Sequence, residues 1–251
     1  MCNIAIIFAG GVGIRMGAET PKQFLNVYGK PILIHTLEKF QYNENIDKIY
    51  VACKIEWIDE LNSLIKKHKI TKVEPGGVVP GGKNGQDSIY NALCEARKHN
   101  TLDSIVLIHD GVRPIIDDKT INDNIESVKK TGSAISCIPA FETPIQSRDG
   151  LTIDNILPRK EIYIAKAPQS FFLGAVLEAH ENERQSNEGY NGVVDTCNLM
   201  MKYGCKPTII HCGSGNIKVT TPDDYIDLIA KYLSEDYKHF FEMNNKQKHL
   251  S

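Results

Sequence analysis

The sequence predicts a single α/β domain built on a mostly parallel sheet with helices on both faces. Short, almost wholly apolar runs alternate with segments of helical periodicity over roughly the first 140 residues, which is the pattern of repeated strand–helix units. The runs lack the strict alternation of half-exposed strands, so both faces of the sheet are expected to be covered. The chain has 251 residues, of which 41% are hydrophobic and 24% charged. A chain of this length and composition can bury a core without disulfides or a structural metal.

The apolar runs predict four strands in this region, at Asn3–Phe8, Lys48–Cys53, Ser104–His109 and Ser133–Ile138. Helices are predicted where apolar side chains three or four residues apart share one face, at Pro31–Phe40, Glu56–Lys67, Asp87–His99 and Thr120–Lys130. In such sheets ligands lie beyond the carboxyl ends of the strands. This rule directs attention to Ala9–Gln23, Gly76–Ser88 and Asp110–Pro114.

Residues 141–166 interrupt this pattern with turn signals and short alternating runs, and we interpret them as a β-arm that leaves the main sheet. Beyond the arm we predict helices near Phe171–Asn187 and Val194–Tyr203, and strands at Pro207–His211 and Asn216–Val219. A last helix is predicted after Thr221, a residue suited to the N-cap. We assign residues 1–236 to the domain and residues 237–251 to a polar tail.

The charge balance argues against several classes of function. Lys and Arg total 29 while Asp and Glu total 31, a net charge of −2, whereas nucleic-acid binding usually needs a basic excess. No apolar run reaches the roughly 18 residues of a membrane span, and the first ten residues do not resemble a signal peptide. The seven cysteines include no C-x-x-C pair, so neither a disulfide framework nor a zinc module is indicated. We expect a cytoplasmic protein whose reduced thiols lie mostly in the core.

The strongest functional signal is the segment AGGVGIRMGAETPKQFL at residues 9–25. Glycines directly after a buried strand let a ligand approach the main chain closely, and their N–H groups suit phosphate oxygens. Arg15 and Lys22 follow on the same loop, so it carries the fixed cations that a nucleoside triphosphate requires. The glycines miss the dinucleotide-binding fingerprint by one residue, and no helix is expected to open directly after them.

A second glycine-rich segment at Gly81–Ser88 offers main-chain atoms, and Ser88, to read the edge of a base. It overlaps a P-loop pattern, but Asn84 stands where Ser or Thr should bind Mg²⁺, and we expect a turn rather than a helix start at Gly85. Without further context a loop and an N-cap explain the segment equally well.

A third segment, IHDGVRP, places Asp110 at the end of a buried strand. This position suits Mg²⁺, which is commonly bound by one or two carboxylates together with substrate phosphates and water. Pairing of Asp110 with Arg113 is the structural alternative. His109 is expected to pack rather than to bind metal. Judged by charge alone, Arg159 in the arm and Lys218 would be solvated surface residues.

In combination these segments resemble the IspD/TarI family of cytidylyltransferases. The resemblance is carried by AGGVGIRMG…PKQFL, the loop ending at Ser88, HDGVRP, Arg159 followed by Ala167-Pro168-Gln169, and NIKVTTPDD at residues 216–224, in the family's order. It extends over nearly the whole chain, to about Leu233. It implies a nucleotide-diphospho-sugar transferase-like fold with a protruding β-arm, a homodimer formed through that arm, Mg²⁺ as cofactor, and CTP and a polyol phosphate as substrates.

The resemblance also implies a role for each matching residue. The catalytic group is Arg15, Lys22, Lys218 and Arg159, of which the first two stabilise charge on the triphosphate. Acceptor binding is implied for Thr143, Arg159, Lys218 and Arg113, with Thr143 acting across the dimer interface, and Asp110 is the residue near Mg²⁺. CTP binding, with Gly82 and Ser88 reading cytosine, is implied for Phe8, Ala9, Gly10, Gly11, Gly81, Gly82, Lys83, Asn84, Gly85, Gln86, Asp87 and Ser88.

Some residues depart from the family pattern and bear on the acceptor. Methylerythritol phosphate enzymes usually begin with A-A-G and carry an Arg in GG-x-x-R-x-x-S, where this chain has Ala9-Gly10-Gly11 and Gly85. These features resemble the ribitol 5-phosphate branch, which makes CDP-ribitol for teichoic acids or capsules. Pro144 after Thr143 also indicates a different acceptor pocket. Ala167 replaces a Thr common in the family, so an acceptor contact from that hydroxyl is not expected.

We therefore expect a ribitol 5-phosphate cytidylyltransferase. Two alternatives of the same class are a methylerythritol phosphate enzyme and an enzyme for another polyol phosphate. Two alternatives of a different class are a nicotinamide-dependent oxidoreductase and a non-catalytic nucleotide-binding module.

Overall fold

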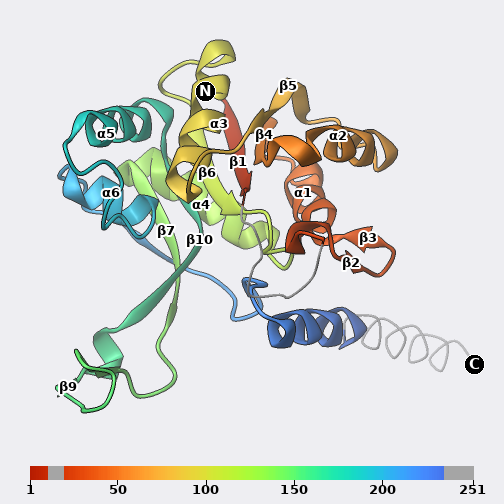
Figure 1. Cartoon of the computed structure of the whole chain (residues 1–251). Coiled ribbons are helices and arrows are strands. Elements are labelled where there is room, and N and C mark those ends of the chain that lie inside the picture. Colours follow the sequence, from red (N-terminus) through yellow and green to blue (C-terminus); the bar gives the residue numbers. More distant parts are fainter. Residues whose placement is uncertain (11–19, 235–251) are drawn as a thin grey trace, which may run out of the picture.

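The computed structural model describes residues 1–10 and 20–234. Within them the main sheet has the strand order β11-β7-β10-β6-β1-β4-β5 (Figure 1). Neighbouring strands pair in parallel except β10, which is antiparallel to both β6 and β7. The predicted mostly parallel α/β sheet is therefore confirmed. In chain order its strands are β1 (Asn3–Ala9), β4 (Lys48–Cys53), β5 (Val73–Pro80), β6 (Ile105–Asp110), β7 (Ser133–Pro139), β10 (Tyr163–Phe172) and β11 (Ile209–His211).

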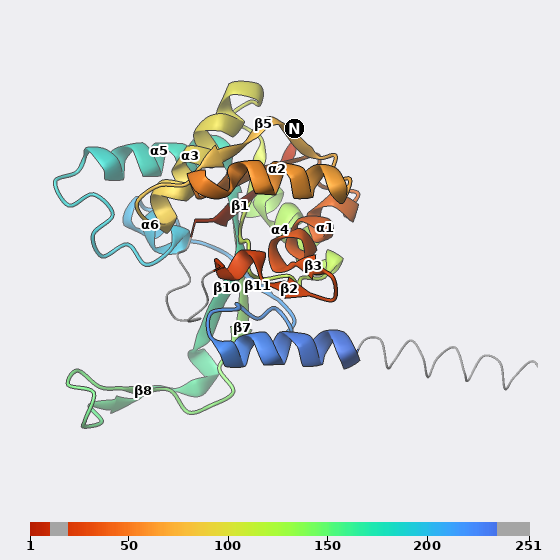
Figure 2. The same ribbon diagram turned by 45° about the vertical axis from the view of Figure 1, so that its right-hand side comes forward.

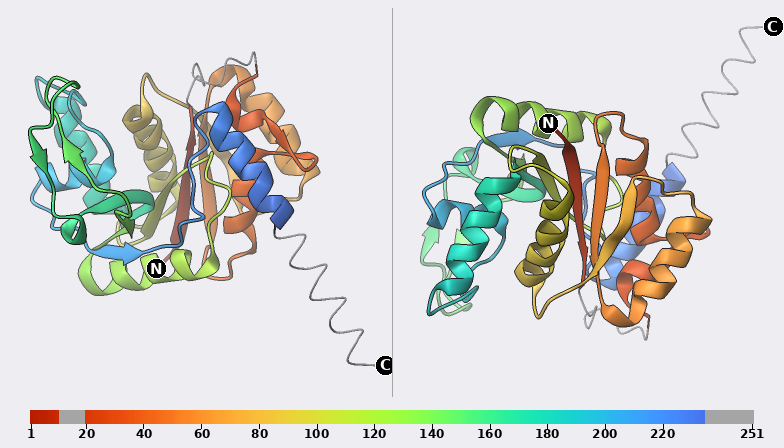
Figure 3. Two further views of the ribbon diagram at one scale, coloured as in Figure 1. Left: turned by 90° about the horizontal axis from the view of Figure 1, so that it is seen from below. Right: turned by 90° about the horizontal axis from the view of Figure 1, so that it is seen from above.

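Helices cover both faces of this sheet, as Figure 3 shows. One face packs against α1 (Ile32–Tyr42), α2 (Ile58–Lys67) and α4 (Asp118–Thr131), and the other against α3 (Gly85–His99), α5 (Leu173–Gln185) and α6 (Thr196–Lys202). In β1, Ala5 and Ile7 belong to the first core while Ile4 and Ile6 belong to the second. Because successive side chains of a strand point to opposite faces, a strand buried on both sides needs an almost wholly apolar sequence.

A third, smaller apolar cluster supports the segments that carry the polar residues discussed below. The helix at residues 222–234 packs beside the hairpin of β2 (Asn26–Val27) and β3 (Lys30–Pro31), as Figure 2 shows. Val112 and Val219 both belong to this cluster, and the Val219 N–H donates to the Val112 carbonyl at 3.0 Å. The cluster thereby joins the loop after β6 to the segment before the last helix.

The predicted β-arm extends away from the sheet between β7 and β10 (Figures 1 and 2). It contains β8 (Ile145–Gln146), β9 (Asn155–Ile156) and the short 3₁₀ turn η4 (Arg159–Glu161). The predicted end of the arm at residue 166 lies inside β10, which continues to Phe172 and joins the main sheet. Large apolar side chains are exposed along the arm, at Phe141, Ile145, Leu151, Ile153 and Ile156.

Other local predictions also need correction. β5 was not predicted, because Pro75, Gly76 and Gly77 break its apolar pattern. The strand expected at residues 216–219 is wrong, because these residues form no regular secondary structure. The turn expected at Gly85 is wrong, since α3 begins there.

The expected burial of the thiols is only partly correct. The seven cysteines all lie in the described residues and are free, but Cys53 and Cys137 alone among them are fully buried. In the part of the chain that the structure describes, no helix is both long and apolar enough to cross a membrane.

Candidate active site

The carboxyl ends of β1, β4, β5 and β6 meet at one edge of the sheet. Phe8 of β1 pairs with Ala52 of β4 on one side and with Asp110 of β6 on the other, and Cys53 pairs with Pro80 at the end of β5. Because β10 runs antiparallel, its first half reaches the same edge. Loops that follow the parallel strands therefore converge here, at the place where ligands bind in open α/β sheets.

One pocket at this edge has a volume of about 320 Å³ and is called here the glycine-side pocket. It brings together most of the residues that the sequence analysis assigned to nucleotide binding. Gly11 and Arg15 lie outside the described residues. The lining consists of Phe8, Ala9, Gly10, Lys22, Gln23, Gly82, Lys83, Asn84, Gly85, Ser88, Asp110, Val112 and Lys218.

The glycine loop before α3 is held by a compact set of hydrogen bonds. Ser88 Oγ accepts from the Gly82 N–H at 3.0 Å and donates to the Asn84 carbonyl at 2.9 Å. The Asn84 side chain caps α3 by accepting from the N–H of Asp87 at 2.8 Å, which satisfies one of the free donors at a helix start. A Cβ added to Gly82 would lie 2.2 Å from Asp87 Cβ. The loop therefore excludes a side chain at Gly82.

The opposite wall of this pocket is also closely packed. A Cβ on Gly10 would lie 2.9 Å from Ser88 Oγ, so the end of β1 and the start of α3 touch across the glycine. Gln23 Nε2 donates to the Ala9 carbonyl at 2.7 Å, which ties the short turn η2 (Lys22–Phe24) to the end of β1. Lys22, the residue before Gln23, lines the pocket together with Gly10.

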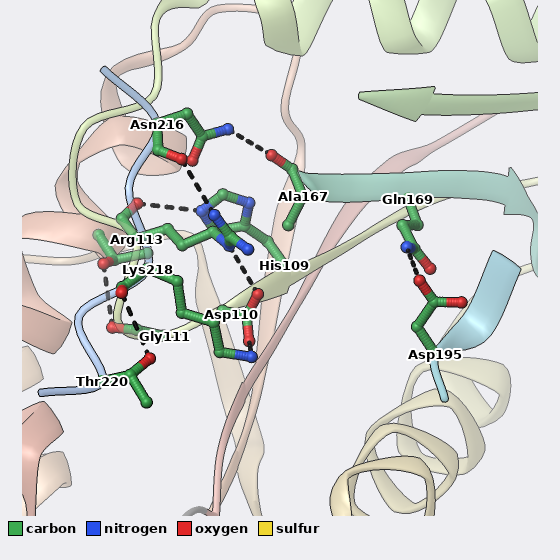
Figure 4. Close-up of polar contacts among 11 residues, drawn as sticks. His109, Asp110, Gly111, Arg113, Ala167, Gln169, Asp195, Asn216, Lys218 and Thr220 are labelled. Atoms are coloured by element: carbon green, nitrogen blue, oxygen red, sulfur yellow. Dashed lines mark hydrogen bonds and ion pairs between the residues drawn. The ribbon is translucent and has the colours of Figure 1, made fainter. Parts of the chain in front are cut away.

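Asp110 is the electrostatic centre of the site, and Figure 4 shows it between two cationic side chains. Lys218 Nζ lies 2.6 Å from its Oδ1, and Arg113 Nε lies 2.8 Å from its Oδ2. Burial raises the pKa of Asp110, but the charges of Lys218 and Arg113 outweigh burial and hold this pKa below its ordinary value. Asp110 is therefore an anion at neutral pH, and each of its oxygens holds one cation.

Two neighbours position Arg113 for this contact. Its Nη1 donates to the Asn216 carbonyl at 3.0 Å, and its own carbonyl lies 3.1 Å from His109 Nε2. Burial lowers the pKa of His109 to about 4, so the imidazole is neutral at pH 7 and stacks edge-on against Phe40. The prediction that His109 packs in the core is confirmed.

A second pocket, of about 340 Å³, adjoins the first and is called here the β10-side pocket. Phe8, Gly85, Asp110 and Lys218 line both pockets, so Lys218 stands at their junction. The sequence analysis placed Gln86 and Arg113 at the site but missed four other residues of this wall: Lys166, Gln169, Asp195 and Thr196. Gln169 belonged to a motif already noted, Ala167-Pro168-Gln169, and Lys166 directly precedes that motif.

The far wall of the β10-side pocket is held together by hydrogen bonds. Gln169 Nε2 donates to Asp195 Oδ2 at 2.7 Å (Figure 4). Gln169 Oε1 accepts from the Cys197 N–H at 2.8 Å. The other Asp195 oxygen accepts from the Asn198 N–H at 2.8 Å and caps α6. These bonds fix the loop before α6 against β10.

Other predicted site residues lie outside both linings. Gly81 donates its N–H to the Cys53 carbonyl at 2.6 Å. Asp87 forms an ion pair with Arg184, whose guanidinium lies 4.5 Å from the centre of the Tyr90 ring.

The two predicted arm residues are also separate from the pockets. Thr143 and Arg159 are both exposed, and Arg159 Nη1 donates to the Phe141 carbonyl within the arm at 3.1 Å. The glycine-side pocket thus offers main-chain N–H groups and cations to phosphate groups, and it adjoins a second polar pocket, with Asp110 and Lys218 lining both. This arrangement suits two phosphorylated ligands that meet at Lys218.

Comparison with known proteins agrees with this geometry. The family described as "IspD: 2-C-methyl-D-erythritol 4-phosphate cytidylyltransferase" matches residues 3–234. The chain belongs to this family. As a member of the IspD family it is a nucleotidyltransferase, and the predicted family, fold class and enzyme class are confirmed.

Relatives in the IspD family differ in how similar they are to this chain. The ribitol-5-phosphate cytidylyltransferase of Vibrio parahaemolyticus serotype O3:K6 is 47% identical over 224 residues, which cover 89% of this chain and 92% of the relative. That of Streptococcus agalactiae serotype V is 44% identical over 245 residues, 97% of this chain and 100% of the relative. The 2-C-methyl-D-erythritol 4-phosphate cytidylyltransferase of Syntrophus aciditrophicus is 36% identical over 225 residues, 89% and 92% of the two chains.

Solved IspD structures share the fold. The 2-C-methyl-D-erythritol 4-phosphate cytidylyltransferase of Francisella tularensis has a TM-score of 0.75 at 32% identity and covers 91% of this chain and 100% of its own. The 4-diphosphocytidyl-2C-methyl-D-erythritol synthase of Anaerococcus prevotii has a TM-score of 0.78 at 25% identity, with coverage of 93% and 96%.

Proposed function

We propose that the protein transfers a cytidylyl group from CTP to ribitol 5-phosphate, giving CDP-ribitol and pyrophosphate, in the cytoplasm and for teichoic acid or capsule synthesis. The main observation in support of this reaction is the junction of the two pockets, where Lys218 and Asp110 line both pockets. The choice of acceptor is supported by the higher identity to ribitol-5-phosphate cytidylyltransferases, 47% and 44%, than to a methylerythritol phosphate enzyme, 36%.

In the proposed reaction a phosphate oxygen of ribitol 5-phosphate attacks the α-phosphorus of CTP. The new bond joins this oxygen to the α-phosphorus, and the bond from the α-phosphorus to the bridging oxygen of the β-phosphate breaks. Pyrophosphate leaves with the electron pair of the broken bond. The attacking phosphate is already an anion, so the reaction needs no strong general base. The barrier is therefore mainly charge repulsion and orientation.

The cations of the site can lower this barrier by offsetting the negative charge of the phosphates. Lys22 lines the glycine-side pocket beside Gly10, where the triphosphate would lie, and Lys218 stands where the two phosphates would meet. Arg113 and Lys218 are held in place by Asp110 before any ligand binds. Preorganised charges of this kind stabilise a transition state without rearrangement during the reaction, and holding both reactants adds proximity.

We also propose that Mg²⁺ accompanies the triphosphate. No cluster of three or more metal-binding side chains occurs within residues 1–10 and 20–234, and Asp110 is the one carboxylate among the described residues that line the glycine-side pocket. One carboxylate beside a phosphate site suits Mg²⁺, which keeps several waters and takes its other ligands from substrate phosphates. The ion would neutralise part of the triphosphate charge.

We further propose a homodimer in which the partner's arm completes the acceptor site. Thr143 and Arg159 are exposed on the arm and do not line either pocket of their own chain. The arm also exposes large apolar side chains, including Leu151 at 90% of its full accessibility. An exposed apolar surface of this kind is typical of an interaction site, and a two-fold dimer would bring each arm to the other subunit.

A panel assay tests the acceptor. The protein is incubated with CTP, Mg²⁺ and either ribitol 5-phosphate, methylerythritol 4-phosphate, arabinitol 5-phosphate or xylitol 5-phosphate, and pyrophosphate release is followed. We expect the highest kcat/KM with ribitol 5-phosphate. A higher value with methylerythritol 4-phosphate would overturn the choice of acceptor. Absence of release with all four, together with binding of NADH, would favour an oxidoreductase. Tight CTP binding without turnover would favour a binding module.

Mixing of variants tests the shared site. Arg159→Ala and Lys218→Ala are each expected to be nearly inactive alone, because each removes a cation from every site. After mixing and subunit exchange, half of the dimers carry one intact site, so about a quarter of the wild-type activity should return. No recovery despite demonstrated exchange would contradict an arm that acts across the interface.

A further inference from the structure

Lys166 lies at an interruption of the main sheet. The pairing of β10 with β7 holds at Ala165 opposite Cys137 and resumes at Gln169 opposite Ile135, with a register shift between them. Such irregularities often change the direction in which a side chain points beside an active site. Here the Ala167 carbonyl accepts from Asn216 Nδ2 at 2.5 Å, which ties the interruption to the segment that carries Lys218. Lys166 lines the β10-side pocket in this position.

The surroundings of Lys166 are cationic. Its side chain is half-buried, and its pKa is lowered first by burial and then by the positive charge of Arg113. Within residues 1–10 and 20–234, Lys166 has no carboxylate in ion-pair contact. Its ammonium group therefore loses part of its hydration beside another cation without an anion in return.

The carboxylates of the pocket are already engaged. Among its described lining residues, Asp110 and Asp195 are the anions, and Arg113, Lys166 and Lys218 are the cations. Asp110 holds Arg113 and Lys218, while Asp195 accepts from Gln169 and from the N–H of Asn198. The described lining therefore carries one net positive charge, and Lys166 is its one cation without a carboxylate in ion-pair contact.

We propose that Lys166 is an acceptor-binding residue whose charge holds the anionic polyol phosphate in the β10-side pocket. This inference rests on the proposed function. A partly desolvated cation beside a like charge is unfavourable unless an anion approaches it, and the acceptor brings a phosphate. Lys166 does not line the glycine-side pocket, so its charge favours the acceptor over CTP. The neighbouring Ala167 has no hydroxyl to offer, which leaves Lys166 as the donor at this place on β10.

Kinetics of charge-removing variants test this role. We compare Lys166→Met and Lys166→Gln, which remove the charge, with Lys166→Arg, which keeps it. Lys206→Met is the matched control, because Lys206 is an exposed lysine between α6 and β11 that lines neither pocket. Pyrophosphate release is measured while CTP and ribitol 5-phosphate are varied separately.

The Met and Gln variants should both raise KM for ribitol 5-phosphate by about tenfold or more, the usual effect of losing a hydrogen bond to a charged group. The KM for CTP should stay within about twofold, since the charge acts on the acceptor. The Arg variant should restore most of the affinity, and Lys206→Met should behave as wild type. An unchanged acceptor KM in Lys166→Met, or an equal rise for CTP, would overturn the proposal. Wild-type behaviour of Lys166→Gln would show that the charge is not what binds.

A binding experiment separates this inference from the proposed function. Inorganic phosphate is titrated into the wild type and into Lys166→Met with CTP present at saturation and no acceptor. We expect weaker phosphate binding in the variant, whichever polyol phosphate the enzyme uses. Equal binding in the two proteins would refute a role of Lys166 in holding an anion, even if ribitol 5-phosphate proved to be the substrate. Failure of the wild type with ribitol 5-phosphate, with phosphate binding that depends on Lys166, would refute the choice of acceptor alone.

Discussion

Replacement of Lys218 by Met removes the cation at the junction of the two pockets. The side chain loses its contact of 2.6 Å with Asp110, while Arg113 keeps its own contact of 2.8 Å with the same carboxylate. Met has a similar length and apolar stem, so the change mainly deletes charge. The variant therefore separates what Lys218 does for the fold from what it does for the reaction.

The two expected magnitudes differ widely. A hydrogen bond to a charged group contributes about 1.5–3 kcal/mol to stability. The Lys218 side chain is 44% exposed, so solvent screens the pair and we expect a loss of about 1 kcal/mol in unfolding free energy. Loss of a preorganised charge at the reacting phosphates costs about 3–4 kcal/mol in the transition state, or about 100- to 1,000-fold in rate. The loss of stability is too small to explain such a loss of activity.

Urea unfolding and steady-state kinetics measure the two effects in the same preparation. We expect kcat/KM for ribitol 5-phosphate to fall by at least about 100-fold, with KM for CTP affected much less. Lys119→Met is the control, because Lys119 forms an exposed ion pair with Asp123 on α4 and lines neither pocket. Should Lys218→Met keep acceptor kcat/KM within about threefold of wild type, Lys218 would be a structural partner of Asp110 and the assignment would fail.

Three further predictions follow from the same geometry. Lys22→Ala should lower kcat by about 100- to 1,000-fold and leave the urea midpoint nearly unchanged, since the side chain lines the pocket and is only partly buried; a near-normal kcat would refute its role. Gly82→Ala should raise KM for CTP by at least about tenfold, because its Cβ would collide with Asp87, and an unchanged KM would show that the loop does not contact the nucleotide. The pKa of buried His109 is lowered to about 4, so its contribution to stability is complete above the unfolded pKa near 6.5 and is lost as pH falls toward 4. Between pH 7 and pH 5 this loss is about 2 kcal/mol, measurable by urea unfolding as the difference between wild type and His109→Gln; an equal pH dependence in both would contradict it.

Much of the sheet was predictable because burial on both faces leaves a plain sequence signal. In β1 and β6 almost every side chain is buried, and in both cases the apolar run matches the strand to within one residue at each end. β5 gave no such signal, since Pro75, Gly76 and Gly77 lie within it and part of it is exposed. Its place in the sheet depends on pairing with β4, which is a long-range contact that local periodicity does not record.

Some residues of the site could likewise be predicted from the sequence and others could not. Glycines and charged residues at strand ends identified Gly10, Lys22, Gly82 and Asp110 because the chemistry resides in their residue types. Lys166, by contrast, looks like any lysine in an exposed arm, and its significance comes from the interruption of the ladder between β7 and β10. Asp195 resembles an ordinary N-cap, which it is, and its place in the pocket wall depends on Gln169 from a different element.

The most direct test is a crystal structure with bound CDP-ribitol, the product that spans both halves of the site. We predict the cytidine against residues 81–88 in the glycine-side pocket, the diphosphate beside Lys218, and the ribitol chain in the β10-side pocket near Lys166 and Gln169. A product whose ribitol chain points away from the β10-side pocket, or whose cytidine lies outside the glycine loops, would contradict a single reaction site formed by the two pockets.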